Sequence, residues 1–391
     1  MASELTRVAV LGSTGSIGQQ ALDVVRALPD RFRLVALAAG GNVGALRDQA
    51  LEFRPEAVWA RPGRDADALR SELPAASWQP LEAMAARADV DVVLVATSGL
   101  AGMAPTLAAL TAGKAVAIAN KEVLVVGGRA VRAALEGGRA RGAELRPVDS
   151  EHSAIWQCLW GEEPRAVARL TLTASGGAFR DRDREALERV TPEEALRHPT
   201  WRMGPKVTVD SATLFNKGLE AIEARWLFDI PLDRIDVLQH RESVVHSMVT
   251  FVDGSVKAQL GEPDMRLPIQ VALGYPARLP AQPAPAMDLA ARGTLTFAPV
   301  DRARFPALAV ALEAGARDDT SAAAVSGADE SAVAHFLAGR CRFTDIPRLL
   351  ERALEAHRPA AEPALEELLA AERWGRRFVD EAVMAGTAGV A

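Results

Sequence analysis

The five residues from Asp149 to Ser153 contain two carboxylates and two hydroxyls. Such polar side chains are not expected in a hydrophobic core. Side chains alternate along an extended backbone, so Asp149 and Glu151 are expected on one side and Ser150 on the other. Paired carboxylates are hard oxygen ligands that suit Mg²⁺ or Mn²⁺ and leave positions open for substrate oxygens. The alternative is a solvated loop in which Ser150 and Glu151 cap the helix that follows.

A second polar cluster contains Ser211, Asn216 and Lys217, followed by Glu220. A hydroxyl, an amide and a fixed cation together suit a phosphate monoester. Glu220 lies three residues after Lys217, the spacing of neighbours on one helical face, and is a candidate third carboxylate for a metal. An exposed Lys–Glu pair on a helix surface is the alternative.

The segment 198–205 contains the large amphipathic side chains of His198, Trp201 and Met203 together with two prolines and a glycine. A loop of this composition suits a lid that excludes water from a reaction. The alternative is a loop whose indole and thioether fold back on the core. Upstream, Ser175 precedes two glycines that permit close approach of a ligand, although a tight turn explains them equally well.

The elements that must position these clusters begin with the apolar run 7–11, followed directly by Gly-Ser-Thr-Gly-Ser-Ile-Gly at 12–18 and a helical pattern. Strand, glycine-rich turn and helix in this order bring backbone N–H groups and a helix N-terminus to a pyrophosphate. A purely structural turn is the weaker alternative, because the placement between strand and helix adds to the motif.

The second expected strand, residues 32–37, is followed by Gly40, Gly41 and Asn42, with no acidic residue. NAD sites usually carry an acid there to bind the ribose hydroxyls, so its absence favours NADPH. Backbone and polar groups near Gly40 and Asn42 are then expected to bind the 2′-phosphate of NADPH.

Further strands are expected at residues 57–59, 91–96 and 115–119, and they alternate with helical segments. This alternation predicts a parallel, doubly wound sheet. The last strand runs into Asn120-Lys121-Glu122, which places a donor, a cation and a carboxylate at the edge where such sheets bind ligands. An ordinary helix start explains the three residues equally well.

Composition limits the function classes. The 391 residues carry a net charge of −6, which argues against a nucleic-acid surface and for small-molecule partners. The two cysteines, Cys158 and Cys341, indicate neither a disulfide framework nor a thiolate metal site. Without a signal-like or membrane-spanning apolar segment, we expect a cytoplasmic protein of two or three domains that does not enter a membrane.

Taken in order, the motifs resemble the 1-deoxy-D-xylulose 5-phosphate reductoisomerase family over essentially the whole chain. The matching strings are GSTGSIG at Gly12, NKE at Asn120, VDSEHSAI at Val148, ASGGAF at Ala174, HPTWRMG at His198, DSATLFNKGLE at Asp210, HSMV at His246 and DGSVKAQLGEPDMRLPI at Asp253. The resemblance implies an NADPH- and divalent-metal-dependent enzyme that rearranges and reduces 1-deoxy-D-xylulose 5-phosphate to 2-C-methyl-D-erythritol 4-phosphate in isoprenoid precursor synthesis. Mg²⁺, Mn²⁺ or Co²⁺ would serve as the metal.

The resemblance also implies roles for individual residues. The catalytic groups would be Lys121 and the metal ligands Asp149, Glu151 and Glu220. The substrate would be bound by Lys121, Ser150, Glu151, Ser175, His198, Trp201, Met203, Ser211, Asn216, Lys217 and Glu220. The cofactor would lie against Thr14, Gly15, Ser16, Ile17, Gly40, Gly41, Asn42, Asn120, Glu122 and Gly204.

The implied fold is of the α/β class, with an N-terminal Rossmann-like sheet, a central α+β catalytic domain and a C-terminal helical bundle, assembled as a homodimer. We expect an NADPH-binding domain at 1–149, a catalytic and dimerisation domain at 150–279, a proline-containing linker at 280–303 and helices at 304–391.

Three segments depart from the family pattern. Gly41 stands where many members have Lys or Arg, so the preference for NADPH over NADH is expected to be narrower. Arg241-Glu242 replaces a Pro-Gln pair, and the string at 326–330 differs from the usual Asn-Ala-Ala-Asn-Glu. The last two changes lie away from the metal and phosphate motifs, so we expect small effects on the chemistry.

Two rival functions use the same N-terminal motif. Another NADP-dependent dehydrogenase of a phosphorylated substrate would not need three carboxylates around one metal. A non-catalytic dinucleotide sensor would leave Trp201, the phosphate cluster and the acidic residues unexplained.

Overall fold

The structure is a computed structural model that describes residues 5–280 and 284–386. The chain divides into two compact units, described separately below. Unit 1 comprises residues 1–123, 129–156 and 264–286, and unit 2 comprises residues 124–128, 157–263 and 287–391. Part of the expected linker, residues 281–283, lies outside the described residues.

Unit 1 is built on a seven-stranded sheet in the order β4-β3-β2-β1-β5-β6-β7, and every neighbouring pair is parallel. The strands are β1 Thr6–Leu11, β2 Phe32–Ala39, β3 Ala57–Ala60, β4 Ser77–Trp78, β5 Val92–Val95, β6 Ala115–Ile118 and β7 Glu144–Pro147. The five expected strands are confirmed as β1, β2, β3, β5 and β6. The two edge strands were missed, because they are short and lack the apolar run of a strand buried on both faces.

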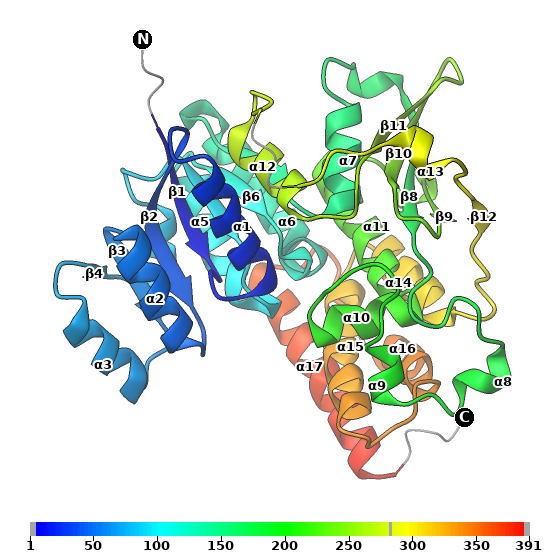
Figure 1. Cartoon of the computed structure of the whole chain (residues 1–391). Coiled ribbons are helices and arrows are strands. Elements are labelled where there is room, and N and C mark those ends of the chain that lie inside the picture. The colour runs from blue at the N-terminus through cyan, green and yellow to red at the C-terminus, as the bar shows by residue number, and fades with distance from the viewer. Residues whose placement is uncertain (1–4, 281–283, 387–391) are drawn as a thin grey trace. The chain divides into compact units, whose positions relative to one another are not determined.

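Helices connect the strands of unit 1, and Figure 1 shows α1 and α2 beside β1 and β2. The connecting helices are α1 Ser16–Ala27, α2 Val43–Phe53, α3 Arg64–Glu72, α4 Leu81–Ala85, α5 Met103–Thr111 and α6 Lys121–Gly138, with 3-10 turns at Gly99–Gly102 and Arg139–Arg141. Helix α7 Ser150–Cys158 follows β7, and α12 Arg266–Gly274 joins unit 1 from later in the chain. The strand order reverses between β1 and β5. In open α/β sheets, ligands bind at the carboxyl ends of the strands on either side of such a reversal.

Unit 2 contains a mixed five-stranded sheet in the order β11-β10-β8-β9-β12, in which only β8 and β9 run parallel. Its strands are β8 Val167–Ala174, β9 Ile235–Gln239, β10 Val245–Phe251, β11 Val256–Leu260 and β12 Ala298–Pro299. The shorter helices of the unit are α8 Arg184–Leu187, α9 Pro192–Ala195, α10 Pro205–Thr213, α11 Phe215–Phe228 and α13 Leu289–Arg292, with 3-10 turns at Pro164–Ala166 and Leu232–Arg234. The α/β fold class expected from the sequence is confirmed.

The C-terminal part of unit 2 is helical, as expected, with α14 Pro306–Ala316, α15 Ser321–Leu337, α16 Asp345–Ala356 and α17 Leu365–Met384. Backbones of α15 and α17 approach closely at two glycines. A Cβ on Gly327 would lie 1.9 Å from the Glu372 carbonyl oxygen, and one on Gly375 would lie 1.9 Å from that of Ala324. Larger residues would therefore separate the helices, so the glycine in the departing string at 326–330 serves helix packing.

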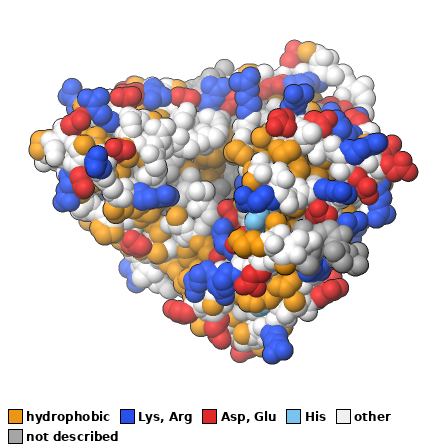
Figure 2. Space-filling model, turned by 90° about the horizontal axis from the view of Figure 1, so that it is seen from below, with side chains coloured by type: hydrophobic (Ala, Val, Ile, Leu, Met, Phe, Trp, Pro, Cys, Tyr) orange, Lys and Arg blue, Asp and Glu red, His pale blue; other side chains and the backbone are white. Residues whose placement is uncertain are grey.

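None of the helices in the described part of the chain combines the length and the apolar character that crossing a bilayer demands. On the face drawn in Figure 2, basic and acidic side chains are interspersed. Many exposed charges form ion pairs, such as Arg26 with Glu52 and Arg317 with Glu313. Exposed pairs of this kind contribute little to stability.

Candidate functional site

The glycine-rich turn at 12–18 closes tightly over the end of β5. Gly12 has a φ of +94°, and a Cβ on it would lie 2.4 Å from the Ala96 carbonyl oxygen. A Cβ on Gly18 would lie 2.2 Å from the Gly12 carbonyl oxygen. Helix α1 begins at Ser16, and Gly15 provides no side-chain cap. The N–H groups of the first turn are therefore left for an anion, which fits the pyrophosphate of a dinucleotide.

The other residues expected at the cofactor in this turn have accessible positions. Gly15 and Ser16 are exposed, and Thr14 and Ile17 are half-buried. The buried Ser13 hydroxyl donates to the Gln49 side-chain oxygen of α2 at 2.7 Å, and this bond anchors the turn to α2. The turn thus presents mainly backbone to a ligand.

At the carboxyl end of β2, Gly40 is half-buried, and Gly41 and Asn42 are exposed. The Asn42 side chain accepts a hydrogen bond from the Ala45 N–H at 3.1 Å and caps α2. A Cβ on Gly41 would meet nothing within 4 Å. No cationic side chain therefore comes from the segment 40–42 itself.

The Asn120 side chain is used inside the protein. Its oxygen accepts from the Val123 N–H at 3.2 Å and caps α6, while its amide donates to the carbonyls of Thr97 and Gly99, each at 2.7 Å. Asn120 is buried, so the helix-start interpretation holds for its side chain. Its carboxylate neighbour Glu122 lies half-buried in the first turn of α6, where the helix dipole favours negative charge.

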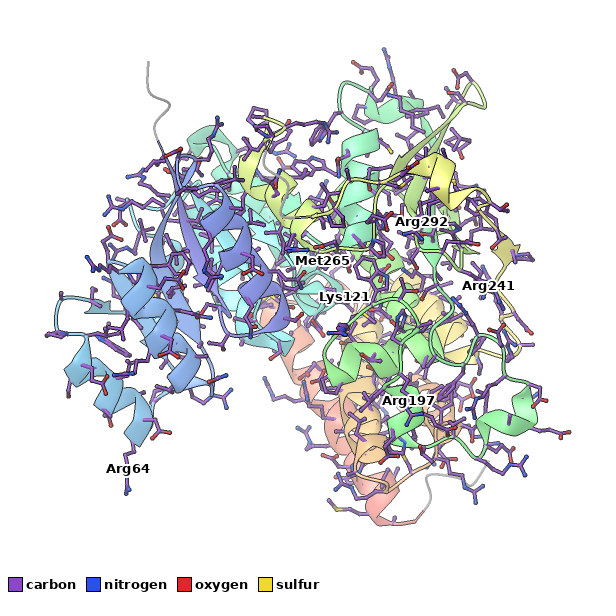
Figure 3. All side chains as sticks on the ribbon, viewed as in Figure 1. Arg64, Lys121, Arg197, Arg241, Met265 and Arg292 are labelled. Carbon is purple, nitrogen blue, oxygen red and sulfur yellow. The ribbon has the colours of Figure 1, made fainter. Side chains whose placement is uncertain are left out.

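Lys121, labelled in Figure 3, is the first residue of α6, and its Nζ lies 2.9 Å from Asp149 Oδ2. Both side chains are largely buried, with 13% and 18% exposed. A partly dry setting strengthens such an ion pair compared with one at the surface. The structure thus brings these two expected catalytic residues of unit 1 together.

The extended conformation expected for 149–151 is wrong, because helix α7 begins at Ser150. The Asp149 carboxylate accepts from the Ser150 N–H at 3.0 Å, and its carbonyl accepts from the Ser153 N–H at 2.8 Å. Aspartate satisfies free N–H groups at a helix start, and this local preference decides the conformation. Glu151 lies in the first turn and accepts from the Ser150 hydroxyl at 2.5 Å.

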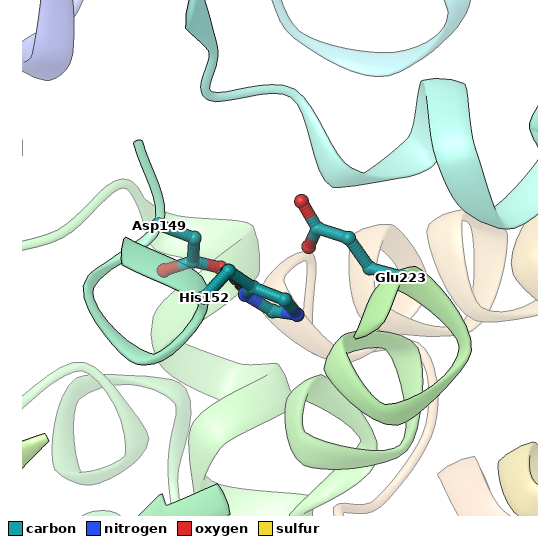
Figure 4. A group of neighbouring side chains, drawn as sticks. All are labelled: Asp149, His152 and Glu223. Carbon is teal, nitrogen blue, oxygen red and sulfur yellow. Dashed lines mark ion pairs between the residues drawn. The ribbon is translucent and has the colours of Figure 1, made fainter. Parts of the chain in front are cut away.

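Two further ionisable groups were missed in the sequence. His152 is fully buried, with its Nδ1 3.9 Å from Asp149 Oδ2. Glu223, one turn after Glu220 on α11, is also fully buried. Figure 4 shows Asp149, His152 and Glu223. The sequence could have indicated both groups, because each follows an expected metal ligand by three residues, His152 after Asp149 and Glu223 after Glu220. This is the spacing of neighbours on one helical face.

Helix α11 buries its polar cluster, so the alternative of an exposed pair is wrong. The amide of Asn216 donates to Glu220 Oε1 at 2.5 Å, and Lys217 Nζ lies 2.6 Å from Glu220 Oε2. The Lys217 and Glu220 side chains are only 7% and 2% exposed. Burying such charges carries a desolvation cost that a surface pair avoids, so stability alone gives no reason for them.

His198 is held as one neutral tautomer that connects two expected substrate residues. Its Nδ1 lies 3.1 Å from the Thr200 N–H nitrogen and 2.8 Å from that of Trp201, and since backbone N–H groups only donate, Nδ1 accepts. Its Nε2 therefore carries the proton and donates to Ser175 Oγ at 3.0 Å. Burial, with the positive charges of Arg180 and Lys217, lowers the pKa of His198 to about 4. The Ser175 hydroxyl keeps its own proton for another acceptor.

The glycines after Ser175 pack against protein backbone. Gly177 has a φ of +69°, and a Cβ on it would lie 2.4 Å from the carbonyl oxygen of Ser211 in α10. The close approach is thus to α10, and it brings the Ser175 turn beside Ser211. The Gly177 N–H also donates to the Ser175 hydroxyl at 3.3 Å.

The segment between α9 and α10 forms neither helix nor strand, as expected for a loop. Trp201 and Met203 are half-buried, and the Trp201 ring lies 6.1 Å from the ring of His246, centroid to centroid. Gly204 precedes α10, and its carbonyl accepts from both the N–H and the hydroxyl of Thr208. Closure of this loop over a ligand remains a prediction.

The donor chemistry fits a hard divalent cation. Asp149 and Glu151 offer carboxylate oxygens in unit 1, and Glu220 and Glu223 offer carboxylate oxygens in unit 2. Within each unit a lysine ammonium already lies against one carboxylate, Lys121 at Asp149 and Lys217 at Glu220. The carboxylates are thus arranged to receive positive charge.

Comparison with known proteins gives consistent matches along the chain. Residues 8–128 match the family 1-deoxy-D-xylulose 5-phosphate reductoisomerase, residues 145–228 match its C-terminal domain, and residues 260–378 match the DXP reductoisomerase C-terminal domain. The reductoisomerase of Thermomicrobium roseum is 51% identical over 96% of this chain and 97% of its own length. That of Geobacillus kaustophilus is 50% identical over 95% and 98%.

Solved structures agree with these matches. The reductoisomerase from Zymomonas mobilis in complex with NADPH has a TM-score of 0.89 and 38% identity, and the match covers 97% of this chain and 99% of that one. A DOX-P reductoisomerase in complex with NADPH, fosmidomycin and magnesium has a TM-score of 0.90 and 35% identity, with 97% and 98% covered.

Proposed function

Because the chain belongs to the 1-deoxy-D-xylulose 5-phosphate reductoisomerase family, we propose that it converts 1-deoxy-D-xylulose 5-phosphate to 2-C-methyl-D-erythritol 4-phosphate with NADPH and a divalent metal. It is an NADPH-dependent oxidoreductase of isoprenoid precursor synthesis, and magnesium fits its donor set. The observation in the structure that carries this function is the buried Lys217–Glu220 pair with Asn216 on α11. A protein that only needed a stable helix would place apolar residues there.

The metal ligands in this proposal are Asp149, Glu151 and Glu220. Their support is the family's motif and the oxygen-rich donor set. When bound, a divalent metal supplies Lewis-acid stabilisation of negative charge on substrate oxygens during the rearrangement. His152 lies against Asp149 and Glu223 follows Glu220 on α11, so these two groups are suited to orienting the ligands.

Phosphate binding in this proposal falls to residues of unit 2. Lys217 supplies the cation, Asn216 and Ser211 supply polar contacts, and Ser175 supplies a hydroxyl proton. His198 orients Ser175 through its Nε2 proton and stays neutral, because its pKa lies near 4. Binding of the remote phosphate positions the reacting carbons.

Next to the reacting atoms, the proposal places Lys121 and Ser150. Lys121 Nζ lies 2.9 Å from Asp149 Oδ2, and in this proposal its ammonium group hydrogen-bonds a substrate oxygen. Ser150 donates to Glu151, which keeps that carboxylate oriented. The rearrangement would form an aldehyde that is then reduced. Trp201 and Met203 would cover the carbon chain and exclude water from this aldehyde.

The cofactor in this proposal lies along the glycine turn and the strand ends of unit 1. The first-turn N–H groups of α1 bind the pyrophosphate near Thr14, Gly15, Ser16 and Ile17, with the ribose near Gly40, Gly41 and Asn42. Asn120 and Glu122 would contact the nicotinamide side, Asn120 through its backbone, and Gly204 would complete the site. When bound, NADPH supplies the hydride for the reduction.

Several finer features belong to the proposal through family membership: a homodimer, a cytoplasmic location, use of Mn²⁺ or Co²⁺ as well as Mg²⁺, and the four-part division at 1–149, 150–279, 280–303 and 304–391. The helical segment from α14 to α17 supports the last boundary.

The test is NADPH oxidation followed at 340 nm with 1-deoxy-D-xylulose 5-phosphate, with and without Mg²⁺, and with the product identified by mass spectrometry. We expect turnover only with the metal. Metal-independent reduction of a phosphorylated substrate without rearrangement would identify the rival dehydrogenase, and cofactor binding without any turnover would identify a sensor.

A further inference from the structure

The 2′-phosphate of NADPH needs a positive group near the carboxyl end of β2, where the adenosine ribose lies in this fold. The segment expected to supply it contains Gly40, Gly41 and Asn42, none of which is charged. Asn42 uses its side-chain oxygen to cap α2, and open space surrounds Gly41. A cation for the phosphate must therefore come from outside this segment.

Arg61 lies beside this segment because β3 pairs in parallel with β2, with Ala60 opposite Ala39. As the residue after β3, Arg61 donates its backbone N–H to the carbonyls of Ala39 and Gly40, both at 3.3 Å. Its guanidinium Nη2 lies 3.4 Å from the position that a Cβ on Gly40 would occupy. The side chain thus extends along Gly40, next to the position left open by Gly41.

Arg61 is exposed, and among the described residues no ion pair involves its guanidinium. Arg33 and Arg47 of unit 1, by contrast, pair with Glu56 and Glu72. An exposed guanidinium with a free fork of N–H donors suits bidentate binding of a phosphate.

We propose that Arg61 binds the 2′-phosphate of NADPH and thereby supplies the cofactor preference that the family's cation at position 41 supplies elsewhere. This inference rests on the proposed function, because it presumes NADPH as the cofactor. It makes Arg61 a specificity-determining residue that reaches the cofactor from β3, whereas the expected contact comes from the end of β2.

The test is isothermal titration calorimetry of the full-length protein with adenosine 2′,5′-bisphosphate and with 5′-AMP, which differ in the 2′-phosphate. For Arg61→Ala we expect affinity for the bisphosphate to fall about ten- to a hundredfold, while affinity for 5′-AMP stays within about twofold. Kinetic measurement of NADPH against NADH should show the same selective loss.

Two further variants make the test specific. Arg31→Ala removes an exposed arginine at the opposite end of β2. Among the described residues no ion pair involves its side chain, so both affinities should stay unchanged. Gly41→Lys in the Arg61→Ala background places a cation in open space and should restore most of the bisphosphate affinity.

An Arg61→Ala protein with the bisphosphate preference of the wild type would overturn the role of Arg61 alone and leave the proposed function intact. A wild type that binds the two nucleotides equally would contradict both the role of Arg61 and the use of NADPH. Equal losses for both nucleotides would show that Arg61 supports the fold of the site and does not bind the 2′-phosphate.

Discussion

The glycine turn at 12–18 and the polar face of α11 present opposite kinds of chemistry to a ligand. The turn presents backbone N–H groups, and its tight spacing leaves no room for side chains at Gly12 and Gly18. Helix α11 presents charged side chains, Lys217 and Glu220, from a buried position. The turn therefore requires residues without a Cβ, whereas α11 requires charged side chains. The two should respond to different substitutions.

Removing charge from the proposed metal ligands is expected to have the largest effect. Glu220→Gln, and likewise Asp149→Asn or Glu151→Gln, should reduce turnover at limiting Mg²⁺ by about a hundredfold or more, because a neutral amide is a poorer ligand. Circular dichroism should show a folded protein. Glu313→Gln, an exposed acid on α14, serves as the control. Near-normal turnover in any of the three variants would remove that residue from the metal site.

Adding one carbon to the glycine turn should be the next largest effect. Gly18→Ala forces a Cβ against the Gly12 carbonyl and should lower the free energy of unfolding by about 2–3 kcal/mol, with weaker NADPH binding. Gly137→Ala, at an exposed position of α6 where a Cβ meets nothing within 4 Å, should lower neither quantity. Chemical denaturation and fluorescence titration with NADPH measure both. If Gly18→Ala binds NADPH normally, the turn does not work through its backbone.

Trp201 tests the loop that we expect to cover the substrate. Trp201→Ala should lower kcat/KM for the sugar phosphate about ten- to a hundredfold, while the Kd for NADPH of the free enzyme changes little. Trp201→Phe should retain most activity. Substrate or a metal-chelating phosphonate should protect the loop from proteolysis. Equal losses for substrate and cofactor would show that Trp201 is a packing residue.

The smallest expected effect is a pH dependence from His198. Its pKa of about 4 lies below the ordinary value of 6.5, so the fold favours the neutral ring. The stabilisation is complete above pH 6.5 and is lost as the pH falls from about 6.5 through about 4. Protonation would place an N–H against two backbone donors, and we expect a loss of about 1–2 kcal/mol.

The measurement for His198 is the midpoint of denaturation at pH 7 and pH 4.5 for the wild type and for His198→Gln, whose amide oxygen can still accept from the backbone. The variant should lose less stability on acidification. An identical loss in both proteins would assign the acid sensitivity to other groups.

Much of unit 1 could be predicted from the sequence because its signals are local. An apolar run followed by glycines and a helical pattern identified β1, the turn and α1, and the same logic located β2, β3, β5 and β6. The edge strands β4 and β7 were not predicted, because strands of two and four residues are too short to show a hydrophobic periodicity. The polar clusters at 149–153 and 211–220 were recognised by residue type alone.

Only the tertiary structure decided how those residues are used. Spacing put Lys217 and Glu220 on one face of a helix, but packing of α11 into the core made that face a buried one. Periodicity likewise does not report which strands pair, so the position of Arg61 beside Gly40 follows from the parallel register of β2 and β3. Local sequence determines the conformation and chemistry of a segment, whereas burial and neighbours come from contacts between segments distant in the chain.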